Sequence, residues 1–222
     1  GGKYLYIDEV HKYQNWSTEI KNIYDQIPDL NIVYTGSSIL DLERGTADLS
    51  RRQLKNYMYG MSFREWLQMD KGITIPILSI EQILAGDIPF PYSDYRPLPL
   101  FKEYLYKGYY PFYRDINYFE RLVAVVDQTL EVDIPQFAGL SVGVMRKLKQ
   151  LLQIISQISP FKPNYSDLAR DISVKRDNLK EYIFYMEKSG MIQGLTAPDK
   201  GLNLLAKIDK IYLDNTNLMH AL

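Results

Sequence analysis

The chain has 222 residues, of which 46% are hydrophobic and 24% are charged, and it contains no cysteine. This is the composition of an ordinary globular protein, and the lack of cysteine excludes disulfides, thiol catalysis and thiolate zinc sites. Because only His11 and His220 are available, a histidine-rich metal centre is not expected, whereas Mg²⁺ held by carboxylates is not excluded. No stretch reaches the roughly 18 apolar residues of a membrane span, so we expect a cytoplasmic protein without a membrane partner.

The charges are distributed unevenly along the chain. Residues 1–143 carry 14 basic and 19 acidic side chains, a net charge of −5, whereas residues 144–210 carry 12 and 7, a net charge of +5. This difference indicates two functional regions, of which the second faces a polyanion. A solvated helical face explains the same basic excess, so both interpretations stay open.

Two short apolar runs near the start, residues 4–7 and 31–34, are each followed by polar residues and are predicted to be buried parallel strands. Between them, apolar residues recur at helical spacing. They are Trp16, Ile20, Ile23, Tyr24 and Ile27. The three segments together predict a βαβ unit, and ligands bind such sheets at the carboxyl ends of the strands.

The first of these strands ends in Asp8-Glu9. A hydrophobic strand that ends in these two residues resembles the Walker B element of AAA-type ATPases. The resemblance implies that Asp8 holds Mg²⁺, directly or through water, and that Glu9 orients and deprotonates the attacking water. The alternative is a surface loop that happens to begin with two acidic residues.

The second strand ends in Thr35-Gly36-Ser37-Ser38, at the position where the resemblance places the sensor-1 element. The polar side chain of that element contacts the γ-phosphate or the catalytic water. The resemblance therefore assigns Ser37 to catalysis and Thr35 and Ser38 to nucleotide binding. An ordinary Gly-Ser turn is the alternative.

Further along, a helix-bearing stretch over residues 39–52 ends in Arg51-Arg52 and is followed by residues 56–59 and by Ser62-Phe63-Arg64-Glu65. This order resembles a prokaryotic AAA-type ATPase family that has an arginine, then a strand, then a Pro-Leu-Ser-Phe-Arg-Glu-like motif. The resemblance implies that Arg52 is an arginine finger that reaches the nucleotide of a neighbouring subunit, and hence self-association. A basic helix end that complements the helix dipole is the alternative.

A phosphate-binding loop of the form Gly-x-x-x-x-Gly-Lys-Ser/Thr does not occur in these 222 residues. The resemblance places the first strands and the loop of the family before Gly1, so we expect the chain to be a fragment. ATP and Mg²⁺ are the expected cofactors of the intact parent. The fragment alone is predicted neither to bind nor to hydrolyse ATP.

Two later segments continue the resemblance. Lys107-Gly108-Tyr109-Tyr110-Pro111 resembles a Gly-Gly-Tyr-Pro segment in the lid of the family, with Tyr109 in place of the second glycine, and a helix is predicted from about residue 118 to 131. Residues 210–218 resemble the stretch that leads into a C-terminal, often nuclease-like domain, with Asn217 in place of the usual glycine. No nuclease site is assigned to this chain.

The basic third predicts helices over residues 144–158, 167–172 and 176–188, followed by a hairpin of residues 191–192 and 210–213. This order resembles a winged helix-turn-helix. Its expected core consists of Leu168, Ala169, Ile172, Leu179, Ile183 and Met186. The residues that begin its recognition helix, and that meet DNA if the domain binds it, are Lys175, Arg176, Asn178 and Lys180. Winged helices also bind proteins, so both partners stay open.

The expected fold is therefore a partial α/β P-loop NTPase core, followed by a mainly helical lid and a winged helix-turn-helix. The expected domains are 1–68 for the ATPase core, 69–140 for the lid or connector, 141–214 for the winged helix, and 215–222 for the start of a truncated domain. The expected function is that of an ATPase fragment whose parent couples ATP hydrolysis to conformational work on DNA. A non-enzymatic winged-helix regulator is the alternative from another class, and a structural interaction module is a third.

Overall fold

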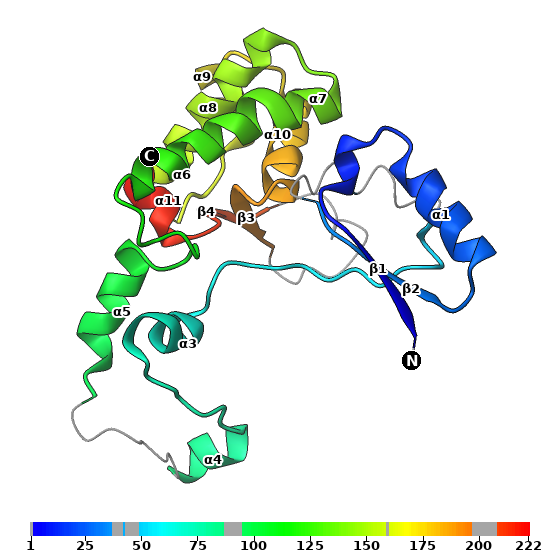
Figure 1. Ribbon diagram of the computed structural model, residues 1–222. Helices are drawn as coiled ribbons and strands as arrows, with labels where there is room; N and C mark the ends of the chain where they lie inside the picture. Colours follow the sequence, from blue (N-terminus) through cyan, green and yellow to red (C-terminus); the bar gives the residue numbers. More distant parts are fainter. Residues whose placement is uncertain (1, 37–41, 43–48, 87–94, 159, 197–207) are drawn as a thin grey trace. The chain divides into compact units, whose positions relative to one another are not determined.

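The computed structural model describes residues 2–36, 42, 49–86, 95–158, 160–196 and 208–222 (Figure 1). The chain forms two compact units that alternate along the sequence. One consists of residues 1–56 and 124–214, and the other of residues 57–123 and 215–222. In this grouping the last eight residues belong with the middle of the chain. The four consecutive domains expected from the sequence stay a prediction.

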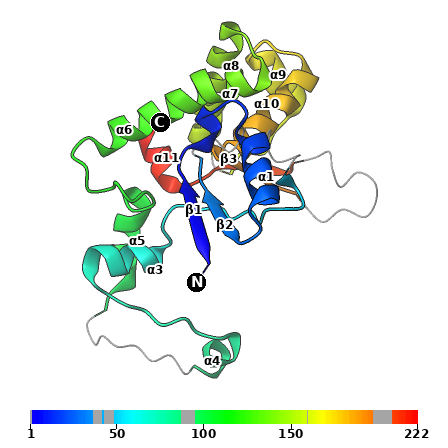
Figure 2. The same cartoon turned by 45° about the vertical axis from the view of Figure 1, so that its right-hand side comes forward.

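The predicted βαβ unit is present at the start of the chain. Strand β1 (Lys3–Ile7) pairs with β2 (Leu30–Tyr34) in parallel, with Ile7 opposite Tyr34, and helix α1 (Trp16–Gln26) connects them after the short turn η1 (Val10–Lys12). Figure 2 shows the two strands side by side, with α1 next to them. The strands leave the unit at the same edge of the sheet, so the residues after each strand become neighbours.

One face of this small sheet forms a core. Val10, Trp16, Ile20 and Leu49 are buried, and the inward-facing strand residues pack against them. The rings of Trp16 and Tyr34, for example, lie 5.4 Å apart. Tight packing of α1 on one face makes the positions of the strand ends well defined.

The other face differs from the prediction of fully buried strands. Tyr4, Tyr6 and Val33 are 63%, 72% and 48% exposed, because successive strand residues point to opposite faces and α1 covers one of them. Tyr24 and Ile27, counted in the apolar pattern of the helix, are also 45% and 44% exposed. A prediction from apolar residue type alone therefore counted too many residues as buried.

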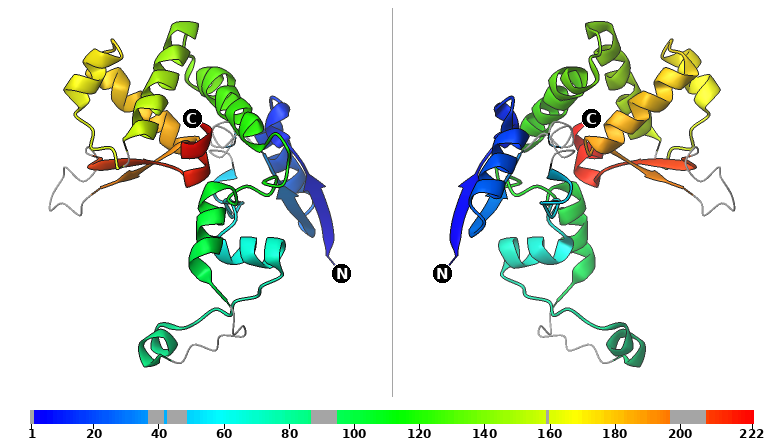
Figure 3. Two further views of the ribbon diagram at one scale, coloured as in Figure 1. Left: turned by 90° about the vertical axis from the view of Figure 1, so that its left-hand side faces the viewer. Right: turned by 90° about the vertical axis from the view of Figure 1, so that its right-hand side faces the viewer.

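The helices and the hairpin predicted in the basic third are present at nearly the expected positions. They are α8 (Val142–Gln157), α9 (Tyr165–Asp171), α10 (Arg176–Lys188), β3 (Ile192–Leu195) and β4 (Lys210–Leu213). Figure 3 shows β3 and β4 as neighbouring arrows, and they pair antiparallel. All six residues of the expected core are at most 5% exposed. Asn164 caps α9 by accepting from the backbone N–H of Asp167 at 3.4 Å.

One strand-like contact was not predicted. Phe161 forms an isolated antiparallel bridge with Ile211, with backbone hydrogen bonds of 3.0 and 2.8 Å in the two directions. The two residues between Pro160 and Pro163 carry too little periodicity to predict such a bridge. The bridge ties the segment between α8 and α9 to β4.

The remaining helices are short. They are α3 (Phe63–Trp66), η2 (Leu67–Lys71), α4 (Ile80–Ala85), α5 (Pro97–Tyr106), α6 (Tyr118–Gln128), η3 (Thr129–Asp133), α7 (Ile134–Ala138) and α11 (Thr216–Ala221). The helix predicted over residues 118–131 thus continues through a wider turn into α7. The strand that the resemblance implies at residues 56–59 is not formed, since these residues are in irregular structure. Over the described ranges, no helix is both long and apolar enough to cross a membrane.

Candidate functional site

Asp8 and Thr35, the first residues after β1 and β2, are in direct contact. The hydroxyl of Thr35 donates to Asp8 Oδ1, and the backbone N–H of Thr35 donates to the carbonyl of Ile7 at 2.9 Å. The register explains this contact, since Ile7 and Tyr34 are paired and the next residue of each strand must follow at the same edge. The structure therefore brings together two of the residues predicted to form the site.

Glu9 follows in an unusual backbone conformation. Its φ of 54° and ψ of 44° are in the left-handed region, which a residue with a side chain rarely adopts. The backbone N–H groups of Glu9 and Val10 donate to the hydroxyl and the carbonyl of Thr35, at 3.4 and 3.0 Å. The end of β2 thus holds Glu9 in a strained turn, a feature that is common at active sites.

The carboxylate of Glu9 faces two basic side chains from η1. Glu9 Oε2 lies 3.7 Å from His11 Nε2 and 3.3 Å from Lys12 Nζ. The side chain of His11 is 13% exposed, whereas that of Lys12 is 72% exposed. The sequence interpretation considered His11 only as a metal ligand and missed this contact. The sequence carries no signal for this contact, because it depends on the left-handed backbone of Glu9.

The donor atoms at this edge suit Mg²⁺. Asp8 is an exposed carboxylate, Thr35 supplies a hydroxyl, and both are hard oxygen donors. Within the described residues, no three histidine, aspartate or glutamate side chains are grouped as in an all-protein metal cage. Mg²⁺ commonly takes one or two carboxylates and completes its shell with phosphates and water, so the residues present fit this ion.

Arg52 is held by an acidic residue of α1. Its Nε donates to Asp25 Oδ1 at 2.9 Å and its Nη2 to Oδ2 at 3.1 Å. These hydrogen bonds raise the pKa of the Arg52 guanidinium. Asp25 lies in the last turn of α1, where the helix dipole disfavours a negative charge, and Arg52 offsets that effect. Arg52 therefore contacts Asp25 within its own chain and is not joined to Asp8 or Glu9.

Ser37 and Ser38, the other residues predicted at the end of β2, lie outside the described residues. The same holds for most of the helix-bearing stretch expected over residues 39–52. The site that the structure describes consists of Asp8, Glu9 and Thr35.

The candidate DNA-contact residues all lie at the start of α10. Lys175 is the N-cap, and Arg176, Asn178 and Lys180 are exposed on the first turns. A tight turn precedes them, in which the N–H of Val174 donates to the carbonyl of Ala169 at 2.8 Å. Lys180 lies 3.4 Å from Asp177, which reduces the positive charge of this face.

The Ser62-Phe63-Arg64-Glu65 motif has a structural explanation. Ser62 caps α3 by accepting from the backbone N–H of Glu65 at 3.3 Å, and the Glu65 carboxylate accepts from the N–H of Ser62 at 2.7 Å. This reciprocal pair is a capping box, and its hydrogen bonds lower the pKa of Glu65. The motif therefore begins helix α3.

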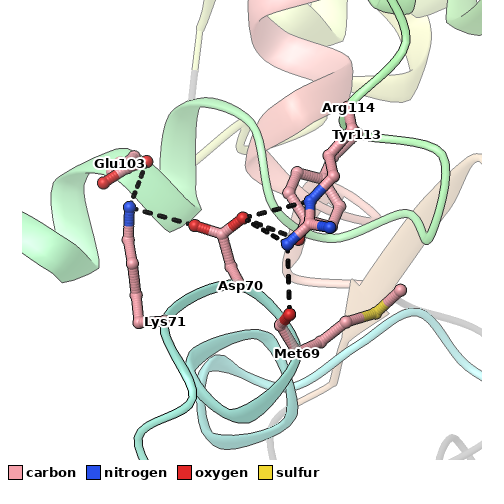
Figure 4. A network of polar contacts seen from close by, with 6 residues as sticks. All are labelled: Met69, Asp70, Lys71, Glu103, Tyr113 and Arg114. Carbon is pink, nitrogen blue, oxygen red and sulfur yellow. Dashed lines mark hydrogen bonds and ion pairs between the residues drawn. The ribbon is translucent and has the colours of Figure 1, made fainter.

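A polar network surrounds Asp70, whose side chain is 15% exposed (Figure 4). Asp70 accepts from the hydroxyl of Tyr113 at 2.8 Å and from Arg114 Nη2 at 3.1 Å, and Lys71 Nζ bridges Asp70 and Glu103 at 3.0 and 2.9 Å. Burial alone would raise the pKa of Asp70, but the hydrogen bonds from Lys71, Tyr113 and Arg114 outweigh it and lower that pKa. The network joins η2 to α5 and to the segment before α6.

Asn217 is fully buried in α11 and uses its whole amide. Its Oδ1 accepts from the backbone N–H groups of Gly108 and Tyr109, at 3.1 and 2.9 Å, and from the hydroxyl of Tyr118 at 2.5 Å. Its Nδ2 donates to the carbonyl of Leu105 at 2.8 Å. Burial raises the pKa of Tyr118, which keeps its hydroxyl a donor. Tyr109 and Asn217, which both depart from the pattern that the chain resembles, thus meet at one contact.

Two family models match separate parts of the chain. Residues 1–67 match the family model described as an AAA domain, which supports an AAA-type ATPase-like domain at the start of the chain. An uncharacterized protein of Methanocaldococcus jannaschii, MJ1637, is 26% identical over 197 residues. That alignment covers 85% of this chain and 41% of the relative, so the chain spans less than half of that protein. No solved structure matches the chain. Residues 98–222, more than half of the chain, match the family described as a domain of unknown function (DUF8612), and the chain belongs to that family.

Proposed function

We propose that the chain contributes the Walker B strand, the sensor-1 element and an arginine finger to an AAA-type ATPase that couples ATP hydrolysis to conformational work. The observation that carries this proposal is the contact between Asp8, Glu9 and Thr35 at the carboxyl edge of two parallel strands. Ligands bind at this edge in open α/β sheets. The AAA domain match over the same residues supports the assignment independently of the geometry.

The three residues have distinct roles in this proposal. Asp8 holds Mg²⁺, which neutralises phosphate charge when it is bound. The hydroxyl of Thr35 keeps the Asp8 carboxylate in place through its hydrogen bond. Glu9 orients a water molecule and accepts its proton as the water attacks the terminal phosphate.

Ser37 and Ser38 are proposed to contact the terminal phosphate or the water, as in the sensor-1 element. Arg52 is proposed to act across an interface between subunits, where its planar fork would pair with a phosphate oxygen. The fork is already matched to a carboxylate by its two bonds to Asp25. To bind a phosphate in the same way, the Arg52 guanidinium would only have to release the Asp25 carboxylate of α1. The proposed partner is therefore a second copy of the same protein.

ATP binding needs a phosphate-binding loop, which is absent from these 222 residues. We propose that a longer protein supplies it, and the greater length of the Methanocaldococcus relative is consistent with this. ATP and Mg²⁺ are the proposed cofactors of that longer protein. The 222 residues alone are proposed to be inactive, which calorimetric titration with Mg²⁺ and ATP checks directly.

The decisive experiment compares Glu9→Gln with wild type in the longer protein. The substitution keeps the size of the side chain but removes the proton acceptor, so turnover should fall on the order of 10²- to 10⁴-fold while ATP binding is retained. Glu19→Gln is a matched control, because Glu19 is exposed on the first turn of α1. Equal turnover in wild type and Glu9→Gln would remove Glu9 from the reaction.

A second candidate function is DNA binding by residues 141–214, and the order of the elements favours it. Helix α8, the bridge at Phe161, helices α9 and α10 and an antiparallel hairpin follow one another in the order that a winged helix would need, and we propose α10 as its recognition helix. The proposed contacts are Lys175, Arg176, Asn178 and Lys180. Duplex DNA affinity should fall steeply with salt, and Lys175→Ala with Arg176→Ala should reduce the salt slope by about two. A salt-independent signal would contradict DNA binding by these residues.

A further inference from the structure

We infer that His11 is a positioning residue that holds the Glu9 carboxylate in place for the reaction. This inference rests on the function proposed for Glu9. It adds a residue for which the sequence interpretation gave no role in hydrolysis, and it is carried by the surroundings of the imidazole.

The imidazole of His11 is fixed by burial. Its side chain is 13% exposed, and its Nε2 lies 3.7 Å from Glu9 Oε2. This distance is slightly longer than a hydrogen bond, and catalytic contacts of this kind often shorten once substrate is bound. The other nitrogen, Nδ1, is buried and has no hydrogen-bond partner among the described residues.

Gly36 explains why the ring stays in this position. A Cβ built on Gly36 would lie 3.0 Å from His11 Nδ1, so the ring packs directly on the backbone that follows Thr35. The imidazole therefore fills the space between the Glu9 carboxylate and the end of β2. Thr35 contacts Asp8, and Gly36 packs against the imidazole beside Glu9. The segment Thr35-Gly36 therefore supports both acidic residues.

A ring in this position can restrain Glu9 more strongly than the neighbouring lysine can. Lys12 approaches the same carboxylate oxygen at 3.3 Å, but its side chain is 72% exposed and ends on a flexible stem. Exposed ion pairs of this kind contribute little, because water and salt screen them. The buried imidazole has few alternative conformations, so it defines the direction of the Glu9 carboxylate.

The test uses three substitutions of His11 in the longer, ATP-hydrolysing protein. Gln places a nitrogen near the position of Nε2, Asn places one only near the position of Nδ1, and Ala removes both. We expect kcat to fall on the order of 10- to 100-fold in His11→Ala and His11→Asn, because small displacements of a catalytic group have effects of this size. His11→Gln should keep kcat within about threefold of wild type, and the KM for ATP should change less than about twofold in all three.

Two further variants make the result specific. In a Glu9→Gln background, His11→Ala should cause no additional loss, because the imidazole acts through the Glu9 carboxylate. Lys12→Ala removes the exposed charge beside Glu9 and should change kcat less than about twofold. The thermal midpoint of each variant reports whether the fold itself has changed.

The possible outcomes separate the two levels of the proposal. If Glu9→Gln turns over as fast as wild type, the proposed function itself is wrong. If Glu9→Gln abolishes turnover but His11→Ala hydrolyses ATP like wild type, only the role of His11 is wrong. If His11→Gln is as slow as His11→Ala and both unfold at a lower temperature, the imidazole is purely structural and the inference is likewise overturned.

Discussion

Two polar regions of the molecule differ in how they use their hydrogen-bonding groups. One is the strand edge with Asp8, Glu9 and Thr35, and the other is the buried amide of Asn217. Asn217 is fully buried, and both ends of its amide are bonded to backbone and hydroxyl groups. Asp8 and Thr35 are exposed, and the backbone of Glu9 is strained. A saturated buried group leaves no atom for a ligand and therefore serves the fold. An exposed, strained group with acceptor capacity left over is suited to chemistry.

This difference separates residues whose hydrogen bonds are used within the fold from residues that keep an acceptor for a ligand. Ser62 and Glu65 belong to the motif that resembles the family and Asn217 departs from its pattern, but the hydrogen bonds of all three hold helices α3 and α11 in place. Asp8 has an acceptor oxygen beyond the one that contacts Thr35. The comparison predicts large stability effects at Asn217 and small ones at the strand edge.

The largest expected stability effect is that of Asn217→Leu. The substitution leaves the N–H groups of Gly108 and Tyr109 and the hydroxyl of Tyr118 without their acceptor. The carbonyl of Leu105 loses the Asn217 amide and keeps the hydroxyl of Thr216 as a donor. Each buried polar group left unpaired costs about 1–3 kcal/mol, so the free energy of unfolding should fall by more than about 3 kcal/mol. Urea denaturation of the chain, followed by circular dichroism, measures this loss.

Asn215→Ala is the matched control for Asn217. Asn215 is only partly buried, caps α11 by accepting from the N–H of Leu218 at 3.2 Å, and donates to the hydroxyl of Tyr110 at 2.9 Å. Loss of such a cap should lower the free energy of unfolding by about 1 kcal/mol. Equal effects at the two asparagines would contradict the special role of the buried amide.

The next effect is a pH dependence at Asp70. The lowered pKa of Asp70 means that its contribution to stability is fully present above its unfolded-state pKa of about 3.9, and is lost as the pH falls through the folded-state value. Asp70→Asn should therefore lower the free energy of unfolding by about 1–2 kcal/mol at pH 7, with the difference from wild type shrinking below about pH 4. Urea melts from pH 7 to pH 3 give this curve.

Asp177→Asn tests whether the pH effect belongs to the Asp70 network. Asp177 is 92% exposed and forms a single 3.4 Å ion pair with Lys180, so its removal should leave the unfolding curve unchanged over the same pH range. A pH-dependent loss of the same size at Asp177 would show that general charge repulsion, rather than the network, causes the effect.

A smaller effect is expected at the α3 cap. Ser62→Ala removes the acceptor for the N–H of Glu65 and should lower the free energy of unfolding by about 1 kcal/mol. Because the motif is explained by this cap, turnover of the longer protein should be unaffected. A loss of turnover without a loss of stability would show that the motif also acts in the reaction.

Much of the fold was predictable from the sequence because its signals are local. The apolar spacing of Leu179, Ile183 and Met186 fixed the buried face of α10, and all three are at most 1% exposed. The exposed face of the parallel strands was not predictable, because the residues Tyr4 and Tyr6 are apolar whether or not something covers them. The bridge at Phe161 depends on a partner fifty residues away, which local patterns do not encode.

The candidate site was predictable in part for a similar reason. Asp8 and Thr35 follow predicted strands, so parallel pairing was enough to bring them together. Arg52 was assigned from the order and spacing of motifs that resemble a family, and its pairing with Asp25 depends on the packing of α1, which order and spacing do not define. The contact of His11 with Glu9 depends on the left-handed turn at Glu9, and no sequence pattern predicts a strained conformation at a residue with a side chain.

The smallest expected stability effect is at Thr35, and it completes the comparison. Thr35→Val keeps the shape of the side chain and removes the hydroxyl that contacts Asp8 and Glu9. Since the group is exposed, the free energy of unfolding should change by less than about 0.5 kcal/mol. The Asp8 carboxylate would lose its fixed orientation, however, so the affinity of the longer protein for Mg²⁺ with ATP should fall. Isothermal titration measures the affinity, and urea melts measure the free energy of unfolding. A stability loss as large as that of Asn217→Leu would mean that the strand edge with Asp8 and Thr35 also serves the fold.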